Sequence, residues 1–226
     1  MKKQILVTTG TRADYGFLRP LLKKIEKSSK LDLILVVTGT HLSKKHGFTI
    51  NEIINDGFKI SQKIHMIPKT DDNFGMSIGL GKGIIEFSKC FKKFNPDINI
   101  ILGDRDEMLA SSLAAYHMNI INGHIQGGDV SGGLDEYTRH AITKISNIHF
   151  AASKKSKRRI IKMGENPKNI FLTGALSIDE IKSNSITKKK DLEKKYKLKL
   201  TGDEILLIQH PVTTESDMAE QKILNI

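Results

Sequence analysis

Groups that could transfer protons or bind anions are concentrated in one stretch, residues 97–144. Two largely apolar runs in this stretch, Ile98–Leu102 and Met118–Ile125, each end in a polar loop that contains glycine. The loops and the segment after them carry Asp104, Arg105, His124, Gln126, Asp129, Asp135, Glu136, Arg139 and His140. Carboxylates and imidazoles act as general acids and bases, and guanidinium groups bind phosphate. The stretch therefore predicts a site for proton transfer beside an anionic ligand.

The apolar runs themselves predict strands. Short apolar runs between helical patterns are typical of a parallel sheet that is covered on both faces. Further strands are predicted at Gln4–Thr8, Leu31–Val37, Lys59–Ile67, His149–Ala152 and Asn169–Thr173. Ligands of such sheets bind outside the carboxyl ends of the strands. We therefore expect an α/β fold, a Rossmann-like parallel sheet with helices on both faces, whose loops carry the site.

The first predicted strand leads into Gly10–Gly16 and then into a helix. This loop lacks the GxGxxG spacing of dinucleotide-binding proteins. Its backbone N–H groups and the helix N-terminus can still bind an anion, and Arg12 can add a bidentate phosphate contact. An isolated arginine is equally typical of an exposed surface. His41 follows the second strand in the same way, and it is either a ligand contact or a structural histidine.

Composition excludes several classes of protein. The 226 residues are 38% hydrophobic, which is enough for a core, and no apolar run is long enough for a transmembrane helix or a signal peptide. The single Cys90 excludes an internal disulfide and favours a cytoplasmic protein. The net charge is +11, and residues 151–200 hold 15 Lys and Arg against 5 Asp and Glu. Few aromatic residues accompany these charges, so a solvated surface is favoured over a nucleic-acid interface.

The C-terminal quarter differs from the rest. Residues 182–203 are rich in Lys and predict a linker with a weak helix, Glu204–Ile208 predicts a new strand, and Glu215–Leu224 a final helix. One strand and one helix cannot bury a separate core. We therefore expect one Rossmann-like domain at residues 1–174, followed at 175–226 by a linker and the start of an incomplete second domain.

Four motifs occur in order along the chain: GTRADYGFLRPLL, GDRDEML, GGDVSGGLDEYTRHAITK and QHPVTT. Together they resemble the hydrolysing UDP-N-acetylglucosamine 2-epimerases of sialic-acid biosynthesis. The resemblance implies the N-terminal half of a two-domain fold of the glycosyltransferase-B type, with the active site between the domains. It implies conversion of UDP-N-acetylglucosamine and water to N-acetylmannosamine and UDP through a glycal, with no metal or other cofactor. The implied partners are the UDP-sugar and water, with no nucleic acid and no membrane.

The resemblance also implies roles for individual residues. Asp104, Asp135 and His210 match catalytic residues of the family, and Gln126 lies at a position where the family has a catalytic glutamate. The implied substrate-binding residues are Arg12, Asp14, His41, Arg105, Glu136 and Arg139. Arg12 would lie near the diphosphate, while Arg105 and Arg139 would hold carboxylates or phosphates. Taken alone, Asp135 is better explained as a cap at or near the N-terminus of its helix, whereas together with Asp104, His124 and Arg139 it is better explained by function.

Two departures from the family leave alternatives open. A glutamine cannot exchange a proton as a glutamate does. Either Asp129 or Glu136 takes that role, or Gln126 only holds the sugar, or the sugar differs, as in UDP-N,N′-diacetylbacillosamine. Members of the family are also longer, so we expect weak or absent activity from this chain alone.

Other classes of function remain open at this point. They are a non-hydrolysing 2-epimerase, a glycosyltransferase of the same fold, and a UDP-sugar-binding module without turnover. A homo-oligomer is also possible through the apolar faces of the helices predicted at 76–94 and 107–117.

Overall fold

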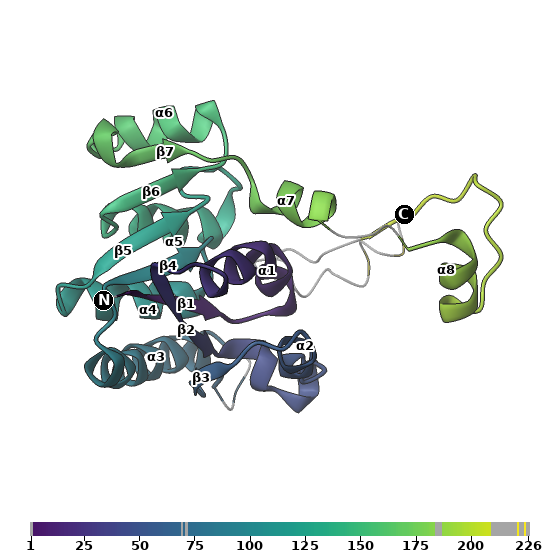
Figure 1. Cartoon of the computed structure of the whole chain (residues 1–226), viewed down its shortest axis with the longest axis horizontal. Helices are drawn as coiled ribbons and strands as arrows, with labels where there is room; N and C mark the ends of the chain where they lie inside the picture. The colour runs from purple at the N-terminus through teal and green to yellow at the C-terminus, as the bar shows by residue number, and fades with distance from the viewer. Residues whose placement is uncertain are drawn as a thin grey trace. The chain divides into compact units, whose positions relative to one another are not determined.

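The computed structural model describes residues 2–68, 70, 72–183, 187–208, 221 and 224. The chain divides into two compact units, Met1–Ser183 and Asn184–Ile226. Figure 1 shows the first unit as a twisted sheet surrounded by helices.

The first unit is built on a parallel sheet in which the described residues form seven strands, in the order β3-β2-β1-β4-β5-β6-β7. The strands are β1 Lys3–Thr9, β2 Leu31–Val37, β3 Ile60–Lys63, β4 Ile98–Leu102, β5 Ile121–Ile125, β6 Ile148–Ala151 and β7 Ile170–Leu172. The predicted α/β fold with a parallel sheet is therefore confirmed. β3 is shorter than predicted and lies at the edge of the sheet, where only one neighbour pairs with it.

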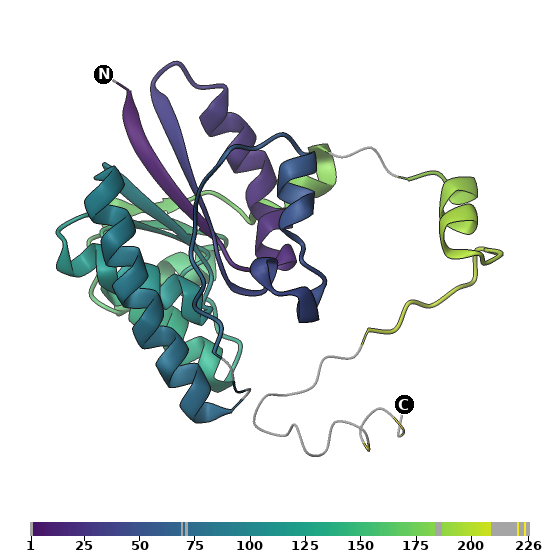
Figure 2. The same cartoon turned by 90° about the horizontal axis from the view of Figure 1, so that it is seen from below.

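Helices cover both faces of this sheet (Figure 2). They are α1 Arg12–Glu26, α2 Ile50–Asn55, α3 Asn73–Phe94, α4 Asp106–His117, α5 Gly133–Lys144, α6 Lys154–Lys162 and α7 Leu176–Ser183. Alternate residues of β1 point to opposite faces. Val7 packs with Leu18 of α1 on one face, and Leu6 packs in the cluster that holds Phe87 of α3 on the other.

α7 belongs to the first unit because it packs on α1. Arg19 of α1 forms an ion pair of 3.4 Å with Glu180 of α7, and Leu176 packs against the core beneath α1. The predicted division, a Rossmann-like domain at residues 1–174 followed at 175–226 by a linker and the start of an incomplete second domain, stays a prediction.

The order of the strands determines where a ligand can bind. The chain passes from β1 to β2 on one side, whereas β4 pairs with β1 on the other side. The loops after β1 and β4 therefore diverge, and a crevice opens between them at the carboxyl end of the sheet. Asp104 and Arg105 lie in the loop after β4, and Gln126 begins the loop after β5.

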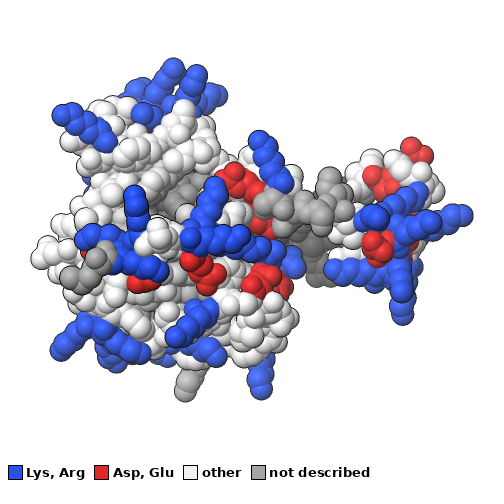
Figure 3. Space-filling view, viewed as in Figure 1, with Lys and Arg blue, Asp and Glu red and all other residues white. Residues whose placement is uncertain are grey.

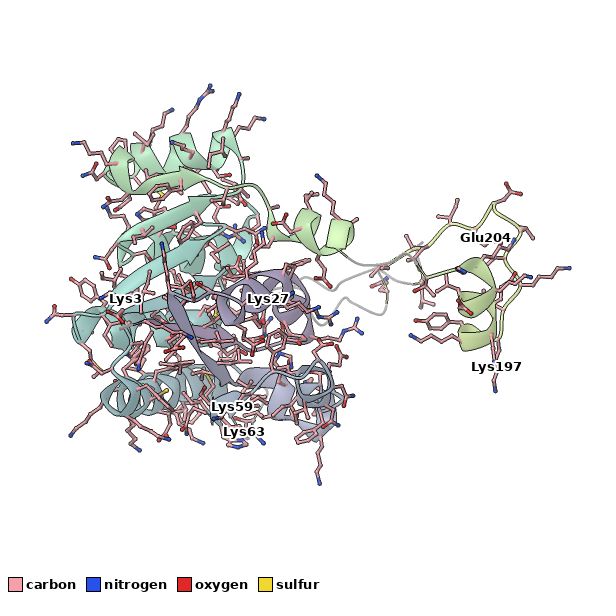
Figure 4. The ribbon with its side chains drawn as sticks, viewed as in Figure 1. Lys3, Lys27, Lys59, Lys63, Lys197 and Glu204 are labelled. Carbon is pink, nitrogen blue, oxygen red and sulfur yellow. The ribbon has the colours of Figure 1, made fainter. Side chains whose placement is uncertain are left out.

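The second unit contains α8, Lys189–Tyr196, and a turn at residues 201–204. In that turn the carboxylate of Glu204, which is labelled in Figure 4, accepts hydrogen bonds from the N–H groups of Thr201 and Gly202. These bonds lower the pKa of Glu204 to about 2. The strand predicted at Glu204–Ile208 is not formed. Ile205 and Leu206 are 91% and 84% exposed, because no described residue pairs with this segment. The predicted helix at Glu215–Leu224 lies largely outside the described residues.

Within the described residues, no helix combines the length and the apolar character that crossing a lipid bilayer requires.

Candidate functional site

A cavity of about 310 Å³ lies at the carboxyl ends of β1, β4 and β5. Its lining residues are Thr11, Ala13, Asp14, Phe17, Leu102, Gly103, Asp104, Arg105, Gln126, Asp129 and Arg139. Of the predicted site residues, the structure thus brings together Asp14, Asp104, Arg105, Gln126 and Arg139. The cavity occupies the crevice that the order of the strands predicts.

The loop after β1 is held in shape by Asp14. Thr11 caps α1, and the Asp14 carboxylate accepts hydrogen bonds from the N–H groups of Thr11 at 2.9 Å and Gly10 at 3.2 Å, as well as from the Thr9 hydroxyl. Burial raises the pKa of Asp14 to about 6, although these hydrogen bonds oppose the shift. Arg12 is exposed on the first turn of α1 and is not among the residues that line the cavity. The N–H groups of Gly10 and Thr11 are already bound by the Asp14 carboxylate.

His41 lies beneath this loop and is fully buried. Its Nε2 atom is 3.0 Å from the Thr9 hydroxyl, and its Nδ1 atom is 2.7 Å from the Thr49 hydroxyl. Burial lowers the pKa of His41 to about 4, so the imidazole is neutral at pH 7. Of the two alternatives, the structure supports the structural one: His41 holds Thr9, which in turn contacts Asp14, and it has no surface for a ligand.

The loop after β4 presents Asp104. Its carboxylate pairs with the guanidinium of Arg139, a residue of α5 that is only 9% exposed. Arg139 also donates to the Asp129 carbonyl at 2.9 Å and to the Ser131 hydroxyl at 3.1 Å. One buried guanidinium thus joins the loop after β4 to the loop after β5. Arg139 contacts a carboxylate, one of the two contacts that the resemblance implied.

Glu107 is a buried charge that sequence reasoning did not single out. It is 6% exposed, and its carboxylate accepts a hydrogen bond of 3.3 Å from Arg105 Nε. The side chain packs beside Gly10 and Gly39. A Cβ at Gly39 would collide with the Glu107 carboxylate and with the Gly10 carbonyl, whereas a Cβ at Gly10 would make a tight contact of 3.0 Å with Glu107 Cδ. Gly39 also has a φ of +56°, which favours glycine. The signal in the sequence was an acidic residue three positions after Asp104, but the glycines against which it packs follow β1 and β2.

The loop after β5 begins with Gln126 in a left-handed conformation, with a φ of +61°. Its N–H group donates to the Phe150 carbonyl at 3.0 Å, which continues the pairing of β5 with β6. Below it, buried His124 contacts the Gly103 carbonyl at 2.8 Å and the Thr143 hydroxyl at 3.1 Å, and burial lowers the pKa of His124 to about 4. A glutamine with positive φ costs about 1–3 kcal/mol, and such strain is typical of functional sites.

Asp135 and Glu136 lie outside the cavity, on the exposed first turn of α5. The helix begins two residues before Asp135, and Gly132 is its N-cap without any side-chain cap, so the capping role considered for Asp135 is wrong. Glu136 contacts the free N–H groups instead, accepting from Gly132 at 2.8 Å and Ser131 at 3.1 Å. These hydrogen bonds lower the pKa of Glu136, and the bond from Gly132 has the largest effect.

His210 lies outside the described residues. Among the residues that the structure does describe, no group of three His, Cys, Asp or Glu side chains has the arrangement of a metal site.

The order of the strands and the position of the cavity first define a class, a Rossmann-like α/β domain of the glycosyltransferase-B type. Two solved structures share this fold. They are UDP-N-acetylglucosamine 2-epimerase from Neisseria meningitidis bound to UDP-N-acetylglucosamine, and the enzyme from Methanocaldococcus jannaschii in complex with that nucleotide sugar and UDP. Both superpose with a TM-score of 0.71 over 86% of this chain, at 21% and 25% sequence identity, and 53% and 51% of their own chains are covered.

The sequence model of the UDP-N-acetylglucosamine 2-epimerase family matches residues 23–226. The chain belongs to the UDP-N-acetylglucosamine 2-epimerase family.

Two relatives of the chain share more of its sequence than these two structures do. The chain is 41% identical to the hydrolysing UDP-N,N′-diacetylbacillosamine 2-epimerase of Legionella pneumophila over 96% of its length, and 35% identical to the UDP-N-acetylglucosamine 2-epimerase of Neisseria meningitidis serogroup B over 97%. It spans 58% and 57% of the length of these two relatives.

Proposed function

We propose that the protein is a hydrolysing 2-epimerase, which converts UDP-N-acetylglucosamine and water to N-acetylmannosamine and UDP. The observation that carries this proposal is the Asp104 carboxylate, held by Arg139 at the wall of a cavity at the carboxyl end of the sheet. A fixed carboxylate of this kind suits a reaction that removes a proton from carbon while positive charge develops beside it.

The first half of the proposed reaction is an elimination. The C1–O bond to UDP breaks with its electron pair leaving on UDP, the C2 proton passes to a carboxylate, and a C1–C2 double bond forms. Water then adds its hydroxyl at C1, and a proton returns to C2 on the opposite face. We assign Asp104 to the first proton transfer or to the stabilisation of charge at C1. Asp135 and His210 are proposed for the remaining steps.

Gln126 has a different proposed role. An amide donates and accepts hydrogen bonds but does not exchange a proton as an acid or base. Asp129 and Glu136 are the two alternatives for that step. The Asp129 carboxylate accepts a hydrogen bond from the Ser156 hydroxyl of α6, and the Glu136 carboxylate accepts from the N–H groups of Ser131 and Gly132. We therefore propose that Gln126, which lines the cavity, holds the sugar. Arg12 and the first turn of α1 would bind the diphosphate.

A second substrate is favoured by the names of two relatives. The relatives from Legionella pneumophila and Campylobacter jejuni, at 41% and 34% identity, are described as hydrolysing epimerases of diacetylbacillosamine nucleotides. Hydrolytic 2-epimerisation of UDP-N,N′-diacetylbacillosamine is therefore the second candidate, and it requires the same protons to move. Binding of either nucleotide sugar without turnover is the third.

An NMR time course in D₂O distinguishes these candidates. The purified chain would be mixed with each nucleotide sugar in turn, with the Asp104→Asn variant as the control. Release of UDP together with a product sugar deuterated at C2 would establish the reaction, and the faster substrate would identify the sugar. Line broadening of the nucleotide sugar without any product would support a binding module. The absence of both product and line broadening would refute the proposal.

The outer face of α3 is a candidate contact surface for a homo-oligomer. Phe74, Ile78 and Ile85 are exposed on the outer face of α3. Light scattering on the purified chain measures the molecular mass directly.

A further inference from the structure

The loop after β5 rests on α6 through residues of one helical face. The Arg159 guanidinium donates to the Gly128 carbonyl, and the Ser156 hydroxyl donates to the Asp129 carboxylate. Gly128 has a φ of +75°, and a Cβ there would lie 2.8 Å from the Ser156 carbonyl oxygen and within contact of Ile160. Positions 156, 159 and 160 are neighbours on a helix surface, so these contacts form one docking face.

This face is buried, although α6 is a strongly basic helix. Ser156 is 1% exposed and Ile160 is fully buried. The exposed part of α6 carries Lys154, Lys155, Arg158 and Lys162, and blue side chains gather over this helix in Figure 3. Arg159 is therefore set apart from the neighbouring cations, because it makes a hydrogen bond to the loop instead of extending into solvent.

The N-terminus of α6 supports the contact with Asp129. Ser153 caps the helix, and its hydroxyl lies 2.6 Å from that of Ser156. The Asp129 carboxylate thus meets a hydroxyl in the first turn of the helix, where the helix dipole favours negative charge. Asp129 lines the cavity beside Gln126, so α6 reaches the cavity wall through it.

Arg139 of α5 holds the same loop from the other side, through the Asp129 carbonyl. The strained backbone of Gln126 lies at the start of this clamped segment. We infer that Ser156 and Arg159 are positioning residues, which hold the loop 126–129 so that Gln126 faces the sugar in the proposed reaction. The inference rests on the proposed function. It gives α6 a role in supporting the site, which the basic composition of this helix does not indicate.

Hydrogen–deuterium exchange of the full chain tests the clamp without any need for turnover. Arg159→Met and Ser156→Ala should each speed amide exchange in residues 126–131 at least about 10-fold, because each removes a hydrogen bond to a partner in the loop. Amides of β1 and α1 should not change. Arg158→Met removes the neighbouring exposed cation and should exchange like the wild type. Unchanged exchange in both clamp variants would overturn the inference.

Kinetics with the nucleotide sugar then separates positioning from simple support. Both clamp variants should lower kcat about 10-fold or more with little change in KM, and Arg159→Lys, which keeps a donor, should recover part of the loss. A loosened loop with unchanged kcat would overturn the positioning role. If the wild-type chain neither binds nor converts either nucleotide sugar, the proposed function fails, while the exchange experiment still decides whether the clamp exists.

Discussion

The Arg139 guanidinium, carried by α5, pairs with the Asp104 carboxylate in the loop after β4, so two segments that are 35 residues apart in sequence share one ion pair. The same guanidinium holds the Asp129 carbonyl. The orientation of the proposed catalytic carboxylate therefore depends on the loop after β5.

Asp104→Asn should remove most of the proposed activity. The variant keeps the shape of the side chain but cannot accept a proton, and general acid–base catalysis contributes about 10²–10⁴-fold in rate. UDP release measured by chromatography would show the loss, and near-normal turnover would contradict the role. Arg139→Lys serves as the companion variant. It keeps the charge but loses the forked geometry, so we expect a smaller fall in kcat than for Asp104→Asn.

Gln126→Gly should stabilise the protein while it impairs the site. Glycine adopts a positive φ without strain, so the free energy of unfolding should rise by about 1 kcal/mol. Asn119 also has a positive φ, at +56°, but it is exposed and outside the cavity. Asn119→Gly should stabilise less, because asparagine tolerates a positive φ better than glutamine does, and it should leave turnover unchanged. Urea unfolding and the NMR assay measure the two effects, and equal activity in both variants would contradict a role for Gln126.

Gly39→Ala should destabilise the protein by about 1–3 kcal/mol, because the new methyl group meets Glu107 and the backbone conformation is left-handed. Gly16 lies inside α1, and a Cβ there meets no atom within 4 Å. Gly16→Ala should stabilise by about 0.5–1 kcal/mol through helix propensity. Thermal unfolding of the pair gives opposite shifts in Tm if this packing is correct.

His124 should make the protein sensitive to acid. Its pKa falls from the ordinary 6.5 to about 4 on burial, so protonation favours the unfolded chain. The neutral imidazole contributes its full stability above pH 6.5, and about 3 kcal/mol is lost as the pH falls towards 4. His124→Gln should be less stable than the wild type at pH 7.5 but lose less stability by pH 4.5. Urea unfolding at a series of pH values measures the free energy of unfolding of both proteins. If it falls by the same amount with pH in the wild type and in His124→Gln, His124 is not the source of the acid sensitivity.

Local patterns predicted the central strands and the loops that carry the site. Ile98–Leu102 is a strand as predicted, and the loop after it reaches the cavity, because apolar runs and the rules for parallel sheets need no knowledge of distant residues. The burial of His41 could not be predicted in this way. Its burial depends on Thr49 and on the packing of Gly39–Leu42 against Gly10, contacts that no local pattern contains.

Other predictions failed for equally physical reasons. α5 begins at Gly133, so the capping contacts fall to Glu136 and not to Asp135. The run Glu204–Ile208 has the composition of a strand, but a strand forms only beside another. The contacts of Ser156 and Arg159 with the loop were hidden in a segment whose charge predicted only a solvated surface.

The packing of Glu107 against two glycines has a consequence for how this site could change. A Cβ at Gly10 would lie 3.0 Å from Glu107 Cδ, so a methyl group there requires the Glu107 side chain to shift by a few tenths of an ångström, whereas the backbone of Gly10 does not have a positive φ. Glu107→Ala should therefore make Gly10→Ala tolerable, and the two substitutions should be strongly non-additive. The loop after β1 and the first turn of α4 therefore cannot be varied independently, and a redesign of either one must choose the residues at positions 10 and 107 together.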